Sequence, residues 1–233
     1  MQPHVLEVGS YDVNGSIRPL FSFATTYTGI DLVEGPNVDY VAHGHEFGET
    51  NRYDIVISAE MFEHNPLWRE TFINMIRVCR PGGVVLFTCA TRMRQEHGTT
   101  RSFKGDSPGT EALGWDYYRN LTAKNFQHAA DLHRHFIDYL FLTVRAAHDL
   151  YFIGLKHGNV SADMPSWLRS AAIEFHALKV HLEDTIQPRS LHSLVLDFPM
   201  TIAERVLPNK YYLNIAHKYL HMRRRLGNRL RGR

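Results

Sequence analysis

The sequence is poor in cysteine, with only Cys79 and Cys89 among 233 residues, and both lie in apolar runs without the spacing of metal ligands. They are typical of small buried hydrophobes, so no disulfide framework is expected. No apolar run approaches the roughly 20 residues that span a bilayer. The first residues, MQPHVLEV, also lack the basic segment and apolar core of a signal peptide. A cytoplasmic protein is therefore expected.

The chain also lacks a strong net charge, which is only +2, but its charges are unevenly distributed. Eight of its 26 basic residues lie from Lys210 to the end, where there is no acid. The segment YYLNIAHKYLHMRRRL has apolar residues at helical spacing ahead of an arginine cluster, so it could lie on an anionic membrane at its inner face. A solvated or disordered basic end is the commonest explanation of such a run, and RNA binding is a third interpretation. A nucleic-acid partner is not favoured.

Four short runs rich in Val, Ile and Leu occur in the first ninety residues, without polar alternation: HVLEVG (4–9), YTGIDL (27–32), YDIVISA (53–59) and GVVLFTC (83–89). They are typical of strands buried on both faces of a parallel sheet. Between the last two, Trp68, Phe72, Met75 and Ile76 recur at helical spacing ahead of Pro81-Gly82-Gly83, which is expected to stop the helix. The fold class is therefore α/β, doubly wound, with ligands beyond the carboxyl ends of the strands.

A stretch at 89–121, rich in Gly, Thr, Arg and Ser, has no clear period and is expected to form a lid or acceptor loop. Residues 121–136 read as a helix, and 137–144 with 149–158 as an antiparallel pair that closes the sheet. Residues 1–158 would form the ligand-binding domain. Residues 159–233 would form a helical extension whose helices are candidate elements of a homodimer.

The first strand runs into VLEVGSYDVNG, where a doubly wound fold accepts a nucleotide. A phosphate loop would need GxxxxGK[ST], but Gly15 is followed by Ser16 and Ile17. A dinucleotide fingerprint would need GxGxxG, which is also missing. What remains is an acid, Glu7, two spaced glycines and a second acid, Asp31, at the end of the second strand.

Four segments in this order, VLEVGSYDVNG, YTGIDL, YDIVISAEMFEH and RVCRPGGVVLFT, resemble the successive motifs of class I S-adenosylmethionine-dependent methyltransferases, in the methyltransferase-domain group. The resemblance implies a Rossmann-like fold with S-adenosylmethionine as cofactor. It implies that Asp31 accepts hydrogen bonds from the ribose hydroxyls and that Glu7 orients the methionine end. The residues that it places on the cofactor are Glu7, Gly9, Ser10, Gly15, Asp31, Leu32, Gly44, His45, Ala59 and Glu60.

The sequence departs from the family's pattern at one position: His43 stands where relatives often carry an acid near the adenine amine. Backbone groups of Gly44 and His45 would then serve the adenine. For Glu60, Glu63 and His64, capping and packing at a helix start remain an alternative to direct ligand contact.

Methyl transfer to a hydroxyl needs an aligned nucleophile and a group that removes its proton. The loop supplies EHG, and His97 is the candidate catalytic residue because an imidazole can act as a base near neutral pH. A solvated loop histidine is the alternative. Candidate acceptor-binding residues are His64, Arg94, Glu96, Tyr117, Tyr118 and Arg119. The stretch GWDYYRNLT could instead pack the loop and cap the next helix through Thr122.

The segments QEHGTTR and GWDYYRNLT resemble a subgroup associated with polysaccharide and glycan synthesis, which implies O-methylation of a saccharide or glycoconjugate. Two alternatives stay open: O-methylation of a non-sugar small molecule, and a cofactor-binding interaction protein without catalysis. Methyltransferases that act on amino-purine or glutamine nitrogens carry [DN]PP[YF] after the strand that corresponds to 53–59, where this sequence has SAEMFEH. This difference counts against N-methylation of such substrates. Glu63, Glu96 and Asp106 could support Mg²⁺ but lack a diagnostic spacing, so no metal site is indicated.

Overall fold

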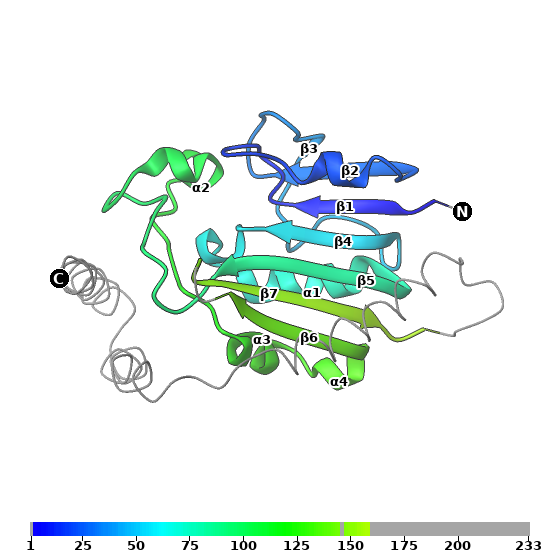
Figure 1. Ribbon diagram of the computed structural model, residues 1–233. Coiled ribbons are helices and arrows are strands. Elements are labelled where there is room, and N and C mark those ends of the chain that lie inside the picture. Colours follow the sequence, from blue (N-terminus) through cyan, green and yellow to red (C-terminus); the bar gives the residue numbers. More distant parts are fainter. Residues whose placement is uncertain (1, 145–146, 159–233) are drawn as a thin grey trace, which may run out of the picture. The chain divides into compact units, whose positions relative to one another are not determined.

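Figure 1 shows the computed structural model, which describes residues 2–144 and 147–158. The expected helical extension at 159–233, its role in a dimer and its basic tail lie outside the described residues. Among the helices of the described part, none is long and apolar enough to cross a membrane.

The described residues form a seven-stranded sheet with the order β3-β2-β1-β4-β5-β7-β6. Neighbouring strands from β3 to β5 are parallel, and β7 is antiparallel to both β5 and β6. The expected Rossmann-like, mostly parallel sheet with an antiparallel closing strand is confirmed. The strands are β1 (His4–Val8), β2 (Thr26–Asp31), β3 (Tyr40–Val41), β4 (Tyr53–Ala59), β5 (Cys79–Ala90), β6 (Phe136–Val144) and β7 (Asp149–Lys156).

The helices are short apart from α1 (Trp68–Val78), which follows β4 as the apolar spacing predicts. The link from β1 to β2 contains a 3-10 turn where a doubly wound fold usually has a helix. The remaining helical elements are η1 (Arg18–Phe21), η2 (Phe62–His64), η3 (Lys104–Asp106), α2 (Pro108–Ala112), α3 (Ala123–Ala129) and α4 (Leu132–His135).

A cluster of phenylalanines joins α1, α3 and η2 to the sheet. Phe87 of β5 lies 4.3 Å from Phe126 of α3 and 4.9 Å from Phe62 of η2, measured between ring centroids. Phe72 of α1 packs edge-on against Phe126 at 5.2 Å. Because Phe62 is fully buried in this cluster, the next two residues of η2, Glu63 and His64, are held at a fixed place beyond the end of β4.

Three local expectations differ from the structure. The helix expected at 121–136 is two helices, because the backbone at Ala130 and Asp131 is extended. The Asp131 carboxylate then accepts a hydrogen bond from the Arg134 amide at the start of α4. β5 begins at Cys79, before the Pro-Gly-Gly segment, which lies in an irregular stretch where its register with β4 shifts. β3 was not expected, since two exposed residues carry no apolar pattern.

Candidate active site

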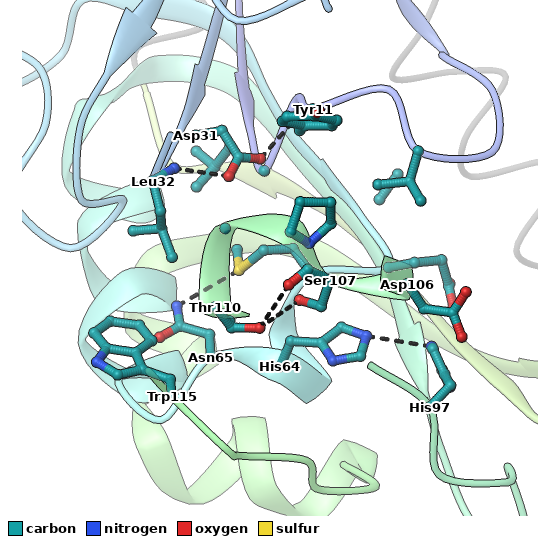
Figure 2. Close-up of a pocket in the computed structure, with 18 of the residues that line it drawn as sticks. Tyr11, Asp31, Leu32, His64, Asn65, His97, Asp106, Ser107, Thr110 and Trp115 are labelled. Atoms are coloured by element: carbon teal, nitrogen blue, oxygen red, sulfur yellow. Dashed lines mark hydrogen bonds between the residues drawn. The ribbon is translucent and has the colours of Figure 1, made fainter. Parts of the chain in front are cut away.

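A cavity of about 880 Å³ lies beyond the carboxyl ends of β1, β2 and β4, as the fold class predicts. One wall comes from the segments that follow these strands. The other comes from the long loop after β5, including η3 and α2. Figure 2 shows side chains from both walls directed toward the same space.

The turn after β1 needs glycine at its first position. Gly9 has φ +81°, and a Cβ there would lie 2.6 Å from Cγ of Met61. The amides of Gly9 and Ser10 both donate to the Ile30 carbonyl, at 2.9 and 3.0 Å, so the turn is tied to β2. At its far end the Gly15 amide donates to Oδ1 of Asp12 at 2.7 Å. The chain therefore passes close to the cavity wall without a side chain at Gly9.

Asp31 stands at the end of β2 on the cavity wall. Its two oxygens accept backbone amides, Oδ2 from Tyr11 at 3.0 Å and Oδ1 from Leu32 at 2.7 Å (Figure 2). Burial raises the pKa of this carboxyl, and the two amides oppose the rise. A carboxylate offers about four acceptor positions. Capacity therefore remains for the two ribose hydroxyls that the motif predicts.

Helix α2 packs against this acceptor. A Cβ on Gly109 would lie 2.8 Å from Oδ1 of Asp31 and 3.2 Å from Cβ of Leu32. The helix also contributes Thr110, whose hydroxyl donates to Ser107 just before α2. The expected lid loop thus approaches Asp31, the expected ribose acceptor, through Gly109, which has no side chain.

The backbone bends sharply where β4 ends. Glu60 has φ +53°, in the left-handed region that non-glycine residues rarely adopt, and its amide donates to the Thr88 carbonyl at 3.0 Å. Such strain persists where surrounding contacts hold it, and it is common at binding sites. The bend starts the segment that carries η2 along the cavity.

Two histidines meet at the other end of the cavity. Nε2 of His64 lies 3.2 Å from Nε2 of His97, and Nδ1 of His97 lies 3.1 Å from the Gln95 carbonyl. Burial, and then the neighbouring His97, lower the pKa of His64 to about 3, so it is neutral near neutral pH. The Tyr118 ring packs edge-on against both imidazoles, and its hydroxyl donates to the Gln95 carbonyl at 3.2 Å.

Ion pairs hold the loop that carries His97. Glu96 accepts from the Arg101 guanidinium, with Nε at 2.9 Å, and from the Thr99 hydroxyl at 2.8 Å. Arg94 donates to Asp149 at 2.9 Å and to the Ala147 carbonyl at 2.7 Å, which ties the start of the loop to β7. Although this segment has no periodic sequence pattern, ion pairs to Arg94 and between Glu96 and Arg101 fix its path.

The structure brings most of the expected site residues together. Eight of the ten residues assigned to the cofactor line the cavity, and Glu7 and Ser10 do not. Glu7 is buried beside β2, where it accepts the Tyr27 hydroxyl at 2.7 Å. Burial raises the pKa of Glu7, and the bond from Tyr27 opposes that rise.

The residues expected around the acceptor divide in the same way. His97, His64, Arg94 and Glu96 line the cavity, whereas Tyr117, Tyr118 and Arg119 do not. The Arg119 guanidinium lies over the Trp68 ring at 5.9 Å, and Thr122 begins α3 in a capping box with Asn125. Trp115, which the sequence offers as an aromatic face for a sugar ring, lines the cavity, whereas sequence reasoning did not assign the lining residues Tyr11, Met61, Asn65, Ser107 and Thr110. Tyr11 lies inside the glycine turn, Met61 lies inside the motif YDIVISAEMFEH and Asn65 follows it directly, whereas Ser107 and Thr110 lie in the loop without a periodic pattern.

The strand order, the glycine turn after β1 and the carboxylate ending β2 together define a class I S-adenosylmethionine-dependent methyltransferase. The family described as Methyltransferase domain matches residues 3–141, and the chain belongs to it. The protein is a methyltransferase whose methyl donor is S-adenosylmethionine. The residues present fit that cofactor, because Gly9 and Asp31 line one cavity and the Asp31 carboxylate has acceptor capacity left for the ribose hydroxyls.

Solved structures of similar fold include Burkholderia thailandensis 1,6-didemethyltoxoflavin-N1-methyltransferase, with TM-score 0.47 and 14% identity, covering 67% of this chain and 72% of that one. Haemonchus contortus phosphoethanolamine N-methyltransferase 2 has TM-score 0.47 and 15% identity, covering 67% of this chain and 50% of that one. NodS from Bradyrhizobium japonicum has TM-score 0.44 and 14% identity, covering 66% and 78%. No curated protein sequence matches the chain.

Proposed function

We propose that this methyltransferase methylates a hydroxyl group of a polar small molecule, namely a saccharide or glycoconjugate, with His97 as the general base. The observation that carries the proposal is the pair of imidazoles on the cavity wall, His64 and His97, with Nε2 atoms 3.2 Å apart. Methyl transfer to a hydroxyl needs a group that takes a proton, and an imidazole does this near neutral pH.

The contacts of His97 support its role as a base. Its Nδ1 faces the Gln95 carbonyl, which can only accept, so Nδ1 carries the proton and Nε2 the lone pair. That lone pair is directed toward His64, which lines the cavity beside it. A hydroxyl bound at this place would replace His64 as the donor to His97. The cofactor supplies an electrophilic methyl group on a sulfonium, whose sulfide leaves without needing a proton.

The wall formed by the long loop favours a hydroxyl-rich acceptor. Side chains with oxygen acceptors line it at Glu96, Ser102 and Asp106, and one aromatic face is added by Trp115. Sugars are commonly bound by such a combination of polar groups and an aromatic ring. Methylation of a non-sugar hydroxyl compound is the alternative acceptor class, and a cofactor-binding protein without catalysis is the alternative class of function.

An acceptor screen tests the proposal. Transfer of a labelled methyl group from S-adenosylmethionine is measured for monosaccharides, nucleotide sugars, oligosaccharides and non-sugar phenols and alcohols, and the product is identified by NMR. We expect an O-methyl sugar. His97→Ala should lower kcat about 10²- to 10⁴-fold. The matched control is His128→Ala, because His128 is exposed on α3 and does not line the cavity.

Each alternative has a distinct outcome in this screen. A product methylated on nitrogen, or on a phenol alone, would replace the saccharide assignment. Unchanged kcat in His97→Ala would remove His97 from proton transfer. Cofactor binding without transfer to any acceptor would favour the non-catalytic alternative.

A further inference from the structure

Three side chains with metal-binding atoms meet at the histidine end of the cavity. Glu63 and His64 come from η2, and His97 comes from the loop after β5. One ligand atom from each lies within 4.8 Å of those of the other two. The two histidines line the cavity, while Glu63 is fully buried behind them.

Glu63 lacks the partners that a buried carboxylate requires. Its exposed fraction is 0%, and neither carboxylate oxygen makes a hydrogen bond of normal geometry. The neighbouring Glu60 also has an unpartnered buried oxygen. Arg94, whose charge acts on both acids, is itself paired with Asp149 at 2.9 Å. A buried carboxylate in this state is costly unless it is protonated or bound to a cation.

The unexplained feature at this place is therefore a deficit of positive charge beside the unpartnered oxygens of Glu63 and Glu60.

The two histidines present the lone pairs that a metal ion needs. His97 donates through Nδ1 to the Gln95 carbonyl, so its Nε2 carries the lone pair, which is the arrangement common for metal-binding histidines. Nε2 of His64 faces the same point, where the ion would replace the proton that His64 donates to His97. Ligand nitrogens at two corners of a tetrahedral zinc site lie roughly 3.3 Å apart. The observed Nε2 separation is 3.2 Å.

We propose that Glu63, His64 and His97 bind a first-row divalent transition-metal ion of the Zn²⁺ or Mn²⁺ type. Two imidazoles with one carboxylate suit such ions, whereas Mg²⁺ prefers oxygen ligands alone. Three protein ligands leave at least one coordination position open, and the two histidines border the cavity on that side.

The inference rests on the proposed function and changes the part played by His97. The cation would lower the pKa of an acceptor hydroxyl beside it, and the proton would pass to solvent. The acceptor oxygen then forms the new C–O bond as the C–S bond breaks, with its electron pair remaining on sulfur. With the ion bound, His97 serves as a ligand, and without it, as the base.

Metal binding is measured on the full chain after chelator treatment and dialysis, by titration calorimetry with Zn²⁺ and Mn²⁺ and by the absorption spectrum with Co²⁺. We expect one tight site that at least one of these ions fills, with no comparable binding of Mg²⁺. Glu63→Gln and His97→Ala should each weaken that site at least 10-fold and change the Co²⁺ spectrum. Glu63→Gln keeps the buried shape, and circular dichroism verifies its folding.

His128→Ala is the control and should retain the tight site, because the chain has 15 histidines that can bind metal weakly elsewhere. Equal metal affinity in the wild type, Glu63→Gln and His97→Ala would overturn the site. Hydroxyl methylation that persists in chelator, with no tight site, would overturn the metal and leave the proposed function standing. A tight site in a protein whose product is methylated only on nitrogen would retain the metal and overturn the proposed function.

Discussion

Thirty-three positions separate His64 from His97, yet their Nε2 atoms lie 3.2 Å apart at the cavity wall. His64 is placed by η2, which Phe62 anchors in the phenylalanine cluster. His97 is placed by a loop that bends back over the His64 ring. The contact therefore depends on two independent elements, the end of β4 and the loop after β5, and both can be tested separately.

Gly98 permits that contact. It has φ +68°, and a Cβ there would lie 2.8 Å from both Cε1 of His64 and Cβ of Ser107. Gly98→Ala should displace His97 and lower kcat at least 10-fold, with S-adenosylmethionine affinity changed little. Gly114→Ala is the matched control, since Gly114 also has φ +68° but nothing lies within 4 Å of its Cβ position. Equal losses in both variants would indicate backbone strain alone.

Removal of the Asp31 carboxylate tests the cofactor assignment. Asp31→Ala takes away a charged acceptor of hydrogen bonds, worth about 1.5–3 kcal/mol per bond, so loss of even one ribose bond should lower affinity for S-adenosylmethionine roughly 10- to 100-fold. Titration calorimetry measures the change. Glu34→Ala is a suitable control because Glu34 is exposed three residues farther along and does not line the cavity. Unaltered affinity in Asp31→Ala would exclude the ribose assignment.

The buried His64 should make the fold sensitive to mild acid. Its pKa is about 3 in the folded chain, whereas an unfolded imidazole has its ordinary value near 6.5. Below about pH 6.5 the unfolded state therefore binds the proton first, and the free energy of unfolding falls as pH falls. Between pH 7 and 5 this costs about 2 kcal/mol.

Urea unfolding of the wild type and His64→Gln, in the presence of a chelator, measures this contribution. The variant lacks the titrating group, so its stability should fall by about 2 kcal/mol less than that of the wild type between pH 7 and 5. Parallel pH dependences for the two proteins would show that His64 is not held neutral in the fold.

The start of α3 offers a test of stability away from the cavity. The Thr122 amide donates to Oδ1 of Asn125 at 2.8 Å in a capping box. Asn125→Ala should lower the free energy of unfolding by about 1 kcal/mol and leave methyl transfer unchanged. Lys124→Ala, on an exposed position of the same helix, should have little effect. A Tm equal in both variants would exclude a stabilising role for the capping box.

The buried strands could be predicted from sequence because β1, β4 and β5 contain short runs rich in Val, Ile and Leu without polar alternation, a pattern set by burial on both faces. The ends of helices and the shortest strand could not be predicted in this way. Asp131 interrupts what looks like one helix, and only the structure shows its carboxylate capping α4. Two exposed residues in β3 pair with β2 without any periodic signal.

The cofactor side of the site could be predicted in the same way, since Gly9 directly follows β1 and Asp31 ends β2, and the carboxyl ends of these parallel strands must meet at one edge of the sheet. The acceptor side could not. His64 and His97 were each recognised as candidates, but their contact depends on the path of a loop without periodicity, fixed by Gly98 and by the Glu96–Arg101 pair. Because the loop follows this path, Tyr117 and Arg119 do not line the cavity.

Titration calorimetry with S-adenosylmethionine and S-adenosylhomocysteine tests the central claim most directly, with NADH as the control ligand. The account predicts micromolar binding of the first two compounds at one site per chain, and none of NADH. Absence of binding by both, in protein that is folded by circular dichroism, would contradict the assignment of the cavity between Gly9, Asp31 and α2 to this cofactor.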